Sequence, residues 1–350
     1  MKKLLFCLSL LICLLLCSCT DEGNEALAPV IPLPDYSGAG ALKDSLDLEY
    51  RLSDDGTYYA VCSIGSCTDT TVVIPSTYND KPVKVIDANA FANRSDIIRI
   101  VIPDGVTSIG EGAFSWCHSL IRVTIGKDVA FIGENAFADC YKLTEVYNRS
   151  SLAISTGAAT HGGVALHASL VTLSSKSSIV KTDDGFYFYK DSHSCSLLGY
   201  DGDKTELTLP GDFDGSSYKI SRYALSGNTK ITKVTIPRGV TAIGDYAFSG
   251  CHSLNAISLP SGLASIGNFA FQSCFCLESV AVPDTVTSIG EFAFFSCPML
   301  KVAIIPKSVT HIGKNAFSGC ASLTISTSHT SEPEGWVGFN PNGRPVQYGK

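Results

Sequence analysis

Cysteines are the residues whose number and spacing most suggest chemistry in this chain of 350 residues, which contains 14 of them. Six recur at one position of a repeated motif, three residues after a phenylalanine: Cys117, Cys140, Cys251, Cys274, Cys297 and Cys320. Thiols in an exported protein form disulfides, bind metal or serve as small buried side chains. No C-x-x-C pair and no histidine partner has zinc spacing, so we predict a ladder of buried free thiols without a metal.

Two histidines, His118 and His252, directly follow ladder cysteines, an order that superficially suggests a Cys–His nucleophile. Both lie at the same position of the repeat, and structural repetition explains them without catalysis. The other histidines are scattered, and the sequence contains no glycine-rich phosphate loop, H-E-x-x-H or G-x-S-x-G motif. We therefore predict no catalytic residues, no cofactor and no enzymatic activity.

The start of the chain predicts export and anchoring. Lys2 and Lys3 precede an apolar run of thirteen residues, Leu4 to Leu16, which is shorter than the ~20 residues of a membrane span. Residues 1–18 are therefore predicted to be a signal peptide. Ser18-Cys19 resembles the cleavage motif of bacterial lipoproteins, so we predict lipidation of Cys19. An ordinary secretory cleavage site is the alternative.

Residues 19–45 have the composition of a tether, acidic just after Cys19 and then rich in proline. These features predict an extracytoplasmic protein on the outer membrane or cell surface, held to the membrane by its lipid anchor only. Loss of Lys2 and Lys3 with the signal peptide changes the net charge from −7 to −9. An acidic chain without a basic stripe argues against nucleic acid as a partner.

A repeat with a step of 23 residues positions these residues. In each repeat an aromatic residue is preceded directly by alanine and five positions earlier by isoleucine. This aromatic position, the ring position, is occupied by Phe91, Phe114, Phe137, Phe248, Phe271, Phe294 and Phe317, and by Leu225 in one further repeat. A period of this length indicates a solenoid, whose units bury their apolar side only by stacking on neighbours. The rings are expected to fill the interior.

Two short apolar segments recur in each repeat. In L-x-x-V-x-I, Val123 and Ile125 alternate with outward Arg122 and Thr124, which predicts a half-buried strand. The segment V-T-x-I-G is expected to cross the other side of the coil, where its glycine allows the backbone a corner.

The whole unit, I-G-x-x-A-F-x-x-C-x-x-L-x-x-V-x-I-P, resembles the BspA-like (treponemal-type) class of bacterial leucine-rich repeats over roughly residues 46 to 350. The resemblance implies a right-handed solenoid of 23-residue coils with short parallel strands, opening β-hairpins and a C-terminal cap. It also implies that the ladder position, which holds Asn228 in one coil, fixes the backbone at a turn. Such proteins are binding scaffolds for many unrelated partners, so the inference about function is an analogy.

A larger module is duplicated, because Asp54-Asp55-Gly56 and Asp183-Asp184-Gly185 begin similar hairpin sequences. We predict a hairpin and cap at residues 46–85, three coils at 86–150, a linker with a second hairpin at 151–219, five coils at 220–328 and a cap at 329–350. One continuous solenoid is favoured over two separate ones, with the second hairpin covering the end of the first coils. Cys62 and Cys67 are either paired or free.

The outward positions of the strands form a stripe, the usual binding surface of a solenoid. In order they are Arg99/Val101, Arg122/Thr124, Glu145/Tyr147, Lys233/Thr235, Ala256/Ser258, Ser279/Ala281, Val302/Ile304 and Ile325/Thr327. The last apolar members either meet a partner or are covered by the C-terminal segment that contains Trp336 and Phe339. We predict the cover.

The resemblance favours a cell-surface scaffold that binds proteins or adheres to host or neighbouring cells, with a host matrix or cell-surface protein as partner. The oligomeric state is left open. An envelope accessory lipoprotein with a structural or glycan-capture role is the alternative. Glycan capture predicts clustered exposed aromatic rings, and the stripe offers only Tyr147.

Overall fold

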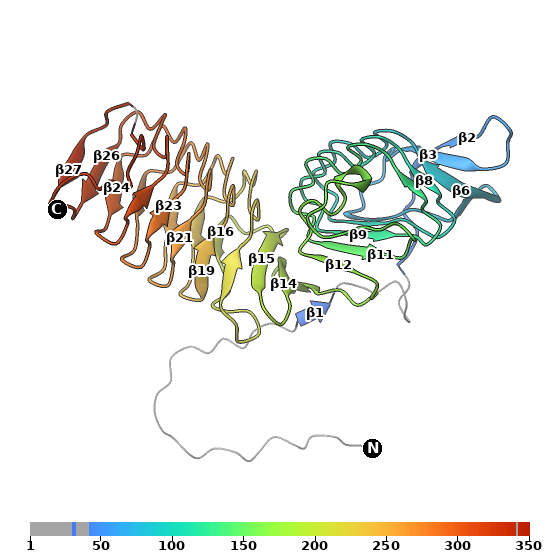
Figure 1. Cartoon of the computed structure of the whole chain (residues 1–350), viewed down its shortest axis with the longest axis horizontal. Helices are drawn as coiled ribbons and strands as arrows, with labels where there is room; N and C mark the ends of the chain where they lie inside the picture. Colours follow the sequence, from blue (N-terminus) through green and yellow to red (C-terminus); the bar gives the residue numbers. More distant parts are fainter. Residues whose placement is uncertain (1–29, 33–41, 341) are drawn as a thin grey trace, which may run out of the picture.

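The computed structural model describes residues 30–32, 42–340 and 342–350, and over these ranges the protein is built almost entirely from short β-strands (Figure 1). The single helix found there is a 3-10 turn, η1 (His161–Gly163). No helix in these ranges is long and apolar enough to cross a membrane. The predicted signal peptide, the lipidation residue Cys19 and most of the predicted tether lie outside the described residues.

The first solenoid has two sheets, one on each side of its coils. One sheet consists of β2 (Glu49–Leu52), β3 (Tyr59–Ser63), β6 (Lys81–Ile86), β8 (Ser108–Ile109) and β10 (Phe131–Ile132), with β5 (Thr77–Tyr78) paired to β6. The other, which we call the strand face, consists of β4 (Thr71–Val73), β7 (Arg99–Val101), β9 (Arg122–Ile125), β11 (Glu145–Asn148) and β12 (Leu170–Thr172).

The second solenoid repeats this plan with more coils. Its longer sheet runs through β1 (Val30–Pro32), β13 (Ile179–Thr182), β14 (Phe186–Lys190), β15 (Cys195–Tyr200), β17 (Tyr218–Ile220), β19 (Val240–Ile243), β21 (Ser265–Ile266), β23 (Ser288–Ile289) and β25 (His311–Ile312). Its strand face contains β16 (Glu206–Thr208), β18 (Lys233–Thr235), β20 (Ala256–Ser258), β22 (Ser279–Ala281), β24 (Val302–Ile305), β26 (Thr324–Thr327) and β27 (Val346–Tyr348).

Parallel pairing between coils explains the 23-residue step. Arg122 of β9 lies opposite Glu145 of β11, one repeat later. The same register stacks the interior rings, with Phe114 5.1 Å from Phe91 and Phe271 5.1 Å from both Phe248 and Phe294 between ring centroids. All seven phenylalanines are buried. The predicted core is therefore confirmed.

The glycine of the I-G motif is required by the closeness of the coils rather than by a corner in the backbone. Gly290 has φ outside the left-handed region, but a Cβ at this position would lie 2.5 Å from the backbone nitrogen of Asn268 in the preceding coil. The matching Gly313 would place a Cβ 2.3 Å from the nitrogen of Glu291. A Cβ would therefore push successive coils apart.

The chain forms two solenoids, so the favoured single continuous solenoid is wrong. No sheet of the described residues passes from one to the other, and the two main apolar cores are separate. The predicted linker closes the first core, because Val164 and Ala165 are buried in it and the Phe137 N–H donates to the Gly162 carbonyl (2.9 Å). This cap leaves no open end for the second hairpin to cover.

Both predicted hairpins form around their D-D-G turns. Asp54-Asp55-Gly56 joins antiparallel β2 and β3, and Asp183-Asp184-Gly185 joins antiparallel β13 and β14. In the second module β15 adds a third antiparallel strand, and β1 pairs with the outer side of β13. Part of the segment predicted as a tether is thus held in a sheet.

The C-terminal segment caps the end of the second solenoid. Trp336 and Phe339 are buried against the last coil, where the Trp336 indole donates to the Val309 carbonyl (3.1 Å) and the Phe317 N–H donates to the Phe339 carbonyl (3.2 Å). Strand β27 then pairs with β26.

Candidate binding surfaces

The ladder cysteines are structural. Each is buried, and each thiol donates to the carbonyl oxygen of the residue 26 positions earlier, as Cys251 does to Leu225 (3.1 Å) and Cys297 to Phe271 (3.1 Å). Burial raises the pKa of the Cys251 thiol to about 12, which opposes nucleophilic chemistry. All six are free thiols, and so are Cys62 and Cys67.

Asn228 takes over the turn function in its coil, because its side-chain oxygen accepts the backbone N–H groups of Lys230 (3.0 Å) and Ile231 (3.1 Å). The two histidines that follow ladder cysteines stack on aromatic neighbours instead of contacting the thiols: His118 on Tyr141 and His252 on Phe275.

The first half of the predicted stripe is not exposed. Its members Arg99, Val101, Arg122, Thr124 and Glu145 are all at most 1% exposed. The prediction that these residues form an open binding surface is therefore wrong. Tyr147, beside them on β11, is half-buried.

The reason for this burial is that the second module packs on the strand face of the first. Tyr187, Tyr189 and Leu198 from β14 and β15 form an apolar cluster with Ile121 and Ile179. The segment before β13 adds polar contacts through Ser175 and Ser177. A surface that a lone solenoid would expose is used here to join the two modules.

A buried ion pair lies beneath that segment. Arg122 and Glu145 are 3.7 Å apart. The Arg122 guanidinium donates to the Ser175 carbonyl (2.8 Å), and the Ser177 hydroxyl donates to the Glu145 carboxylate (2.7 Å). Buried charges persist where such hydrogen bonds compensate for lost water.

The second half of the stripe is accessible. Lys233 is exposed and pairs with Glu206 (3.6 Å), and Thr235 is half-buried. Val302 and Ile304 are 39% and 52% exposed. The predicted cover over these two residues is wrong, because Trp336 and Phe339 close the end of the coils instead. Ile325, by contrast, points into the interior. Strand β26 pairs with β24 at a step of 22 residues instead of 23, so Ile325 lies beside the buried Ala303.

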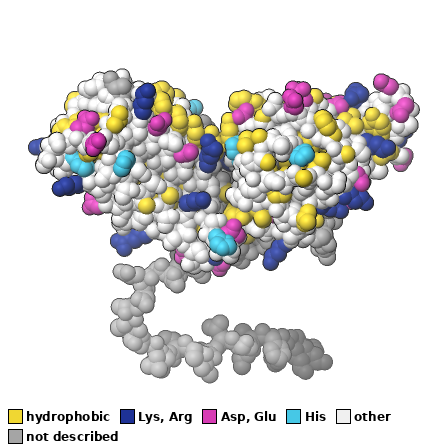
Figure 2. All heavy atoms as spheres, in the orientation of Figure 1, with side chains coloured by type: hydrophobic (Ala, Val, Ile, Leu, Met, Phe, Trp, Pro, Cys, Tyr) yellow, Lys and Arg dark blue, Asp and Glu magenta, His cyan; other side chains and the backbone are white. Residues whose placement is uncertain are grey.

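A second feature of the surface is a continuous row of partly exposed aromatic side chains, which we call the aromatic ladder: Tyr141, Tyr223, Tyr246, Phe269 and Phe292. Neighbouring rings stack with centroids 4.5–4.8 Å apart. The row crosses from the first solenoid, which contributes Tyr141, into four coils of the second. All five side chains are half-buried. Figure 2 shows hydrophobic side chains gathered on the C-terminal solenoid beside the crease between the two solenoids.

The backbone of the ladder is unusual. Tyr223, Tyr246, Phe269 and Phe292 have φ of 58°, 56°, 55° and 54°, in the left-handed region that bulky residues rarely adopt. The equivalent positions of the other coils hold residues that tolerate this conformation: Asn89, Gly112, Asn135 and Asn315. The fold therefore imposes the left-handed turn in every coil, and only four coils place an aromatic ring there.

The sequence contains a signal for this ladder outside the strand motifs. Two residues before the ring position, four successive coils have an aromatic residue, and the coils on either side of them have asparagine or glycine. Aromatic side chains are thus clustered at a turn of the coil and not on the strands, where a glycan-binding surface was expected to have them.

The described residues contain no group of three or more histidine, cysteine or acidic side chains that could hold a metal ion.

The sequence matches the family described as BspA type leucine rich repeat region in six copies, over residues 66–161 and 218–332. No curated protein is similar enough to match.

Among solved structures, the chain is similar to a leucine rich cell surface protein from Faecalibacterium prausnitzii (21% identity, TM-score 0.44, covering 89% of this chain and 96% of that one). It is also similar to the pneumococcal vaccine antigen PcpA (18% identity, TM-score 0.44, covering 87% and 90%). Since the family match spans more than half of the chain, this protein belongs to the BspA-type leucine-rich repeat family.

Proposed function

We propose that this protein is a lipid-anchored cell-surface scaffold that binds a protein on host material or neighbouring cells through its aromatic ladder, without catalysing a reaction. The observation that carries the proposal is the left-handed backbone at the aromatic residues of four successive coils, Tyr223, Tyr246, Phe269 and Phe292. The signal segment and Cys19 support the placement outside the cytoplasm.

Stability alone does not favour these aromatic residues. A left-handed conformation costs a bulky residue roughly 1–2 kcal/mol, and stacking of one ring on the next returns about 0.5–1.5 kcal/mol. At the same positions of other coils, asparagine avoids most of the cost of the left-handed conformation. Since the rings also keep apolar area in water, we attribute them to contact with a partner.

The orientation of the rings favours a protein partner over a glycan. Sugars stack on the faces of aromatic rings. In the ladder the centroids of neighbouring stacked rings are 4.5–4.8 Å apart, so the inner faces cover one another and mainly ring edges are left exposed. Tyrosine and phenylalanine edges fit the side chains of a protein surface, where aromatic residues are common anchors. The accessory envelope role with glycan capture therefore ranks second.

The test replaces ladder rings by the residue that other coils use. Tyr246→Asn with Phe269→Asn should reduce saturation binding of the full chain to immobilised host matrix and mucus proteins by about tenfold or more. Its melting temperature should stay equal or rise, because asparagine tolerates the backbone. The matched control is Val302→Ser with Ile304→Ser on the exposed strand face.

Unchanged binding of the ladder variant would reject the ladder as the contact surface, and a loss confined to the control would move the site to the strand face. Placement is tested separately by protease treatment of intact cells. Cleavage is expected for an outward-facing protein, whereas an inward-facing accessory lipoprotein would be spared.

A further inference from the structure

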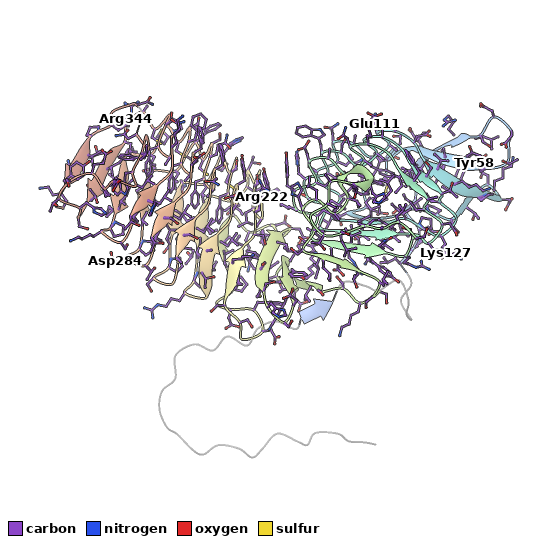
Figure 3. The ribbon with its side chains drawn as sticks, viewed as in Figure 1. Tyr58, Glu111, Lys127, Arg222, Asp284 and Arg344 are labelled. Carbon is purple, nitrogen blue, oxygen red and sulfur yellow. The ribbon has the colours of Figure 1, made fainter. Side chains whose placement is uncertain are left out.

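A groove lies in the crease where the two solenoids meet. It has a volume of about 400 Å³ and is lined from three sides: by Tyr141, Lys142 and His167 of the first solenoid, by strand β15, and by Lys219 and Arg222 of the second solenoid. Figure 3 shows Arg222 at this crease. The volume is in the range of sites for small organic ligands.

Three cations converge on this groove. Lys142, Lys219 and Arg222 line it, and within the described part of the chain none of them forms an ion pair. Arg222 lies over the rings of Tyr141 (6.0 Å) and Tyr223 (5.4 Å), which orient its guanidinium. In a chain with a net charge of −7, this is a local concentration of positive charge.

Lys142 is the most constrained of the three. Its ammonium donates to the Ala224 carbonyl across the junction (3.0 Å), which leaves two of its three N–H donors unused. Burial lowers its pKa to about 8. A lysine placed in this way loses solvation without a partner charge, and a bound anion would supply that charge.

Hydroxyl groups complete the lining. Ser169, Ser196 and Ser221 face the groove, and their hydroxyls form no hydrogen bond with the described residues. Asp245 is the acidic member of the lining, and its carboxylate accepts the Asn268 N–H (2.8 Å). It opposes an anion, but three cations outnumber it.

We propose that this groove binds a sugar acid, a small polyhydroxylated ligand that carries a carboxylate. The carboxylate pairs with Arg222, Lys219 and Lys142, since guanidinium and ammonium groups form strong charge-assisted hydrogen bonds with carboxylates. The sugar hydroxyls pair with the three serine hydroxyls. A bare inorganic anion would satisfy the cations and leave the serines and most of the volume unused. The groove adjoins one end of the aromatic ladder, because Tyr141 belongs to both, but the ladder rings Tyr246 and Phe269 do not line it.

Isothermal titration of the purified full chain tests the proposal with glucuronate and glucose, which differ at a single carbon that is a carboxylate in one and an alcohol in the other. Glucuronate should bind at least about tenfold more tightly than glucose, the value of one charged hydrogen bond. Arg222→Gln and Lys219→Gln should each weaken glucuronate binding by a similar factor. Lys307→Gln, which removes an exposed cation far along the second solenoid, is the control and should bind like the parent.

Four results would overturn the proposal. The first is equal binding of glucose and glucuronate, and the second is undiminished glucuronate binding by Arg222→Gln. The third is binding of inorganic phosphate as tight as that of glucuronate, because it would show an anion site that does not recognise the sugar. Absence of glucuronate binding by the parent chain also rejects it.

Discussion

Single residues of this protein take their properties from the coil or module beside them. Lys142 loses water because the second solenoid covers it, and the Cys251 thiol is protonated because a neighbouring coil encloses it. Gly290 has no room for a side chain because the preceding coil lies against it.

Lys142 should make the stability depend on pH in a defined window. Its folded pKa of about 8 lies below the unfolded value of 10.5, so the unfolded chain binds more protons between these two pH values. The free energy of unfolding of the parent should therefore rise from pH 8 to 10.5 relative to Lys142→Met, and the difference should be constant below pH 8. Urea titrations at several pH values measure it, with Lys307→Met as control. A pH-independent difference would show that Lys142 is well solvated.

Gly290→Ala should destabilise the second solenoid. The added Cβ meets backbone of the preceding coil at 2.5 Å, and overpacking of this kind costs about 1–3 kcal/mol. Gly211→Ala is the matched control, because nothing lies within 4 Å of its Cβ and its φ is not left-handed. Chemical denaturation compares the two. Equal stability of both variants would mean that the coils can separate at no cost.

At the scale of elements, the sequence predicted the coils well because each coil repeats a local pattern. The interior rings, the thiol ladder and both hairpin turns follow from periodicity and turn chemistry, whereas the C-terminal cap was expected from the family resemblance. The strand β14 carried a further signal, since Phe186-Tyr187-Phe188-Tyr189 does not alternate with polar residues. All four side chains are buried, as expected of a strand covered on both faces.

The thiol ladder gives a prediction at this scale. In the native full chain, an alkylating mass tag should label exposed Cys276 readily and leave the six buried ladder cysteines unlabelled. Under denaturing, non-reducing conditions all six should be labelled, because none is in a disulfide. Peptides that link Cys251 to Cys274 through a disulfide would contradict this arrangement.

At the scale of the whole molecule, the docking of two solenoids could not be predicted from repeats. Outward Arg122 and Glu145 have the composition of an exposed face, which is buried by distant parts of the chain: the segment before β13 and the strands β14 and β15. The extension of the aromatic ladder to Tyr141 could not be predicted for the same reason, since the stacking of Tyr141 on Tyr223 depends on this docking. Local periodicity carries no information on which face of one module meets another.

Anchoring is the prediction for the whole molecule. Cys19→Ala should move the protein from the detergent-soluble membrane fraction to the soluble extracytoplasmic fraction, because the acylated residue is lost. Its circular dichroism should not change, since the coils begin dozens of residues later. Cys17→Ala is the control and should stay at the membrane, because Leu16 is too bulky to precede a cleavage site. Retention of Cys19→Ala at the membrane would indicate an uncleaved apolar segment or an envelope partner.

Strand β1 has a mechanical consequence for a protein anchored at Cys19. It pairs with β13, close to where the solenoids join, so tension from the membrane enters near the middle of the molecule rather than at the first hairpin (Figure 1). The length of chain from Cys19 to Val30 can span about 40 Å at most. Under shear flow, both solenoids would rotate about this attachment point near the middle of the molecule, and both would stay exposed to the medium.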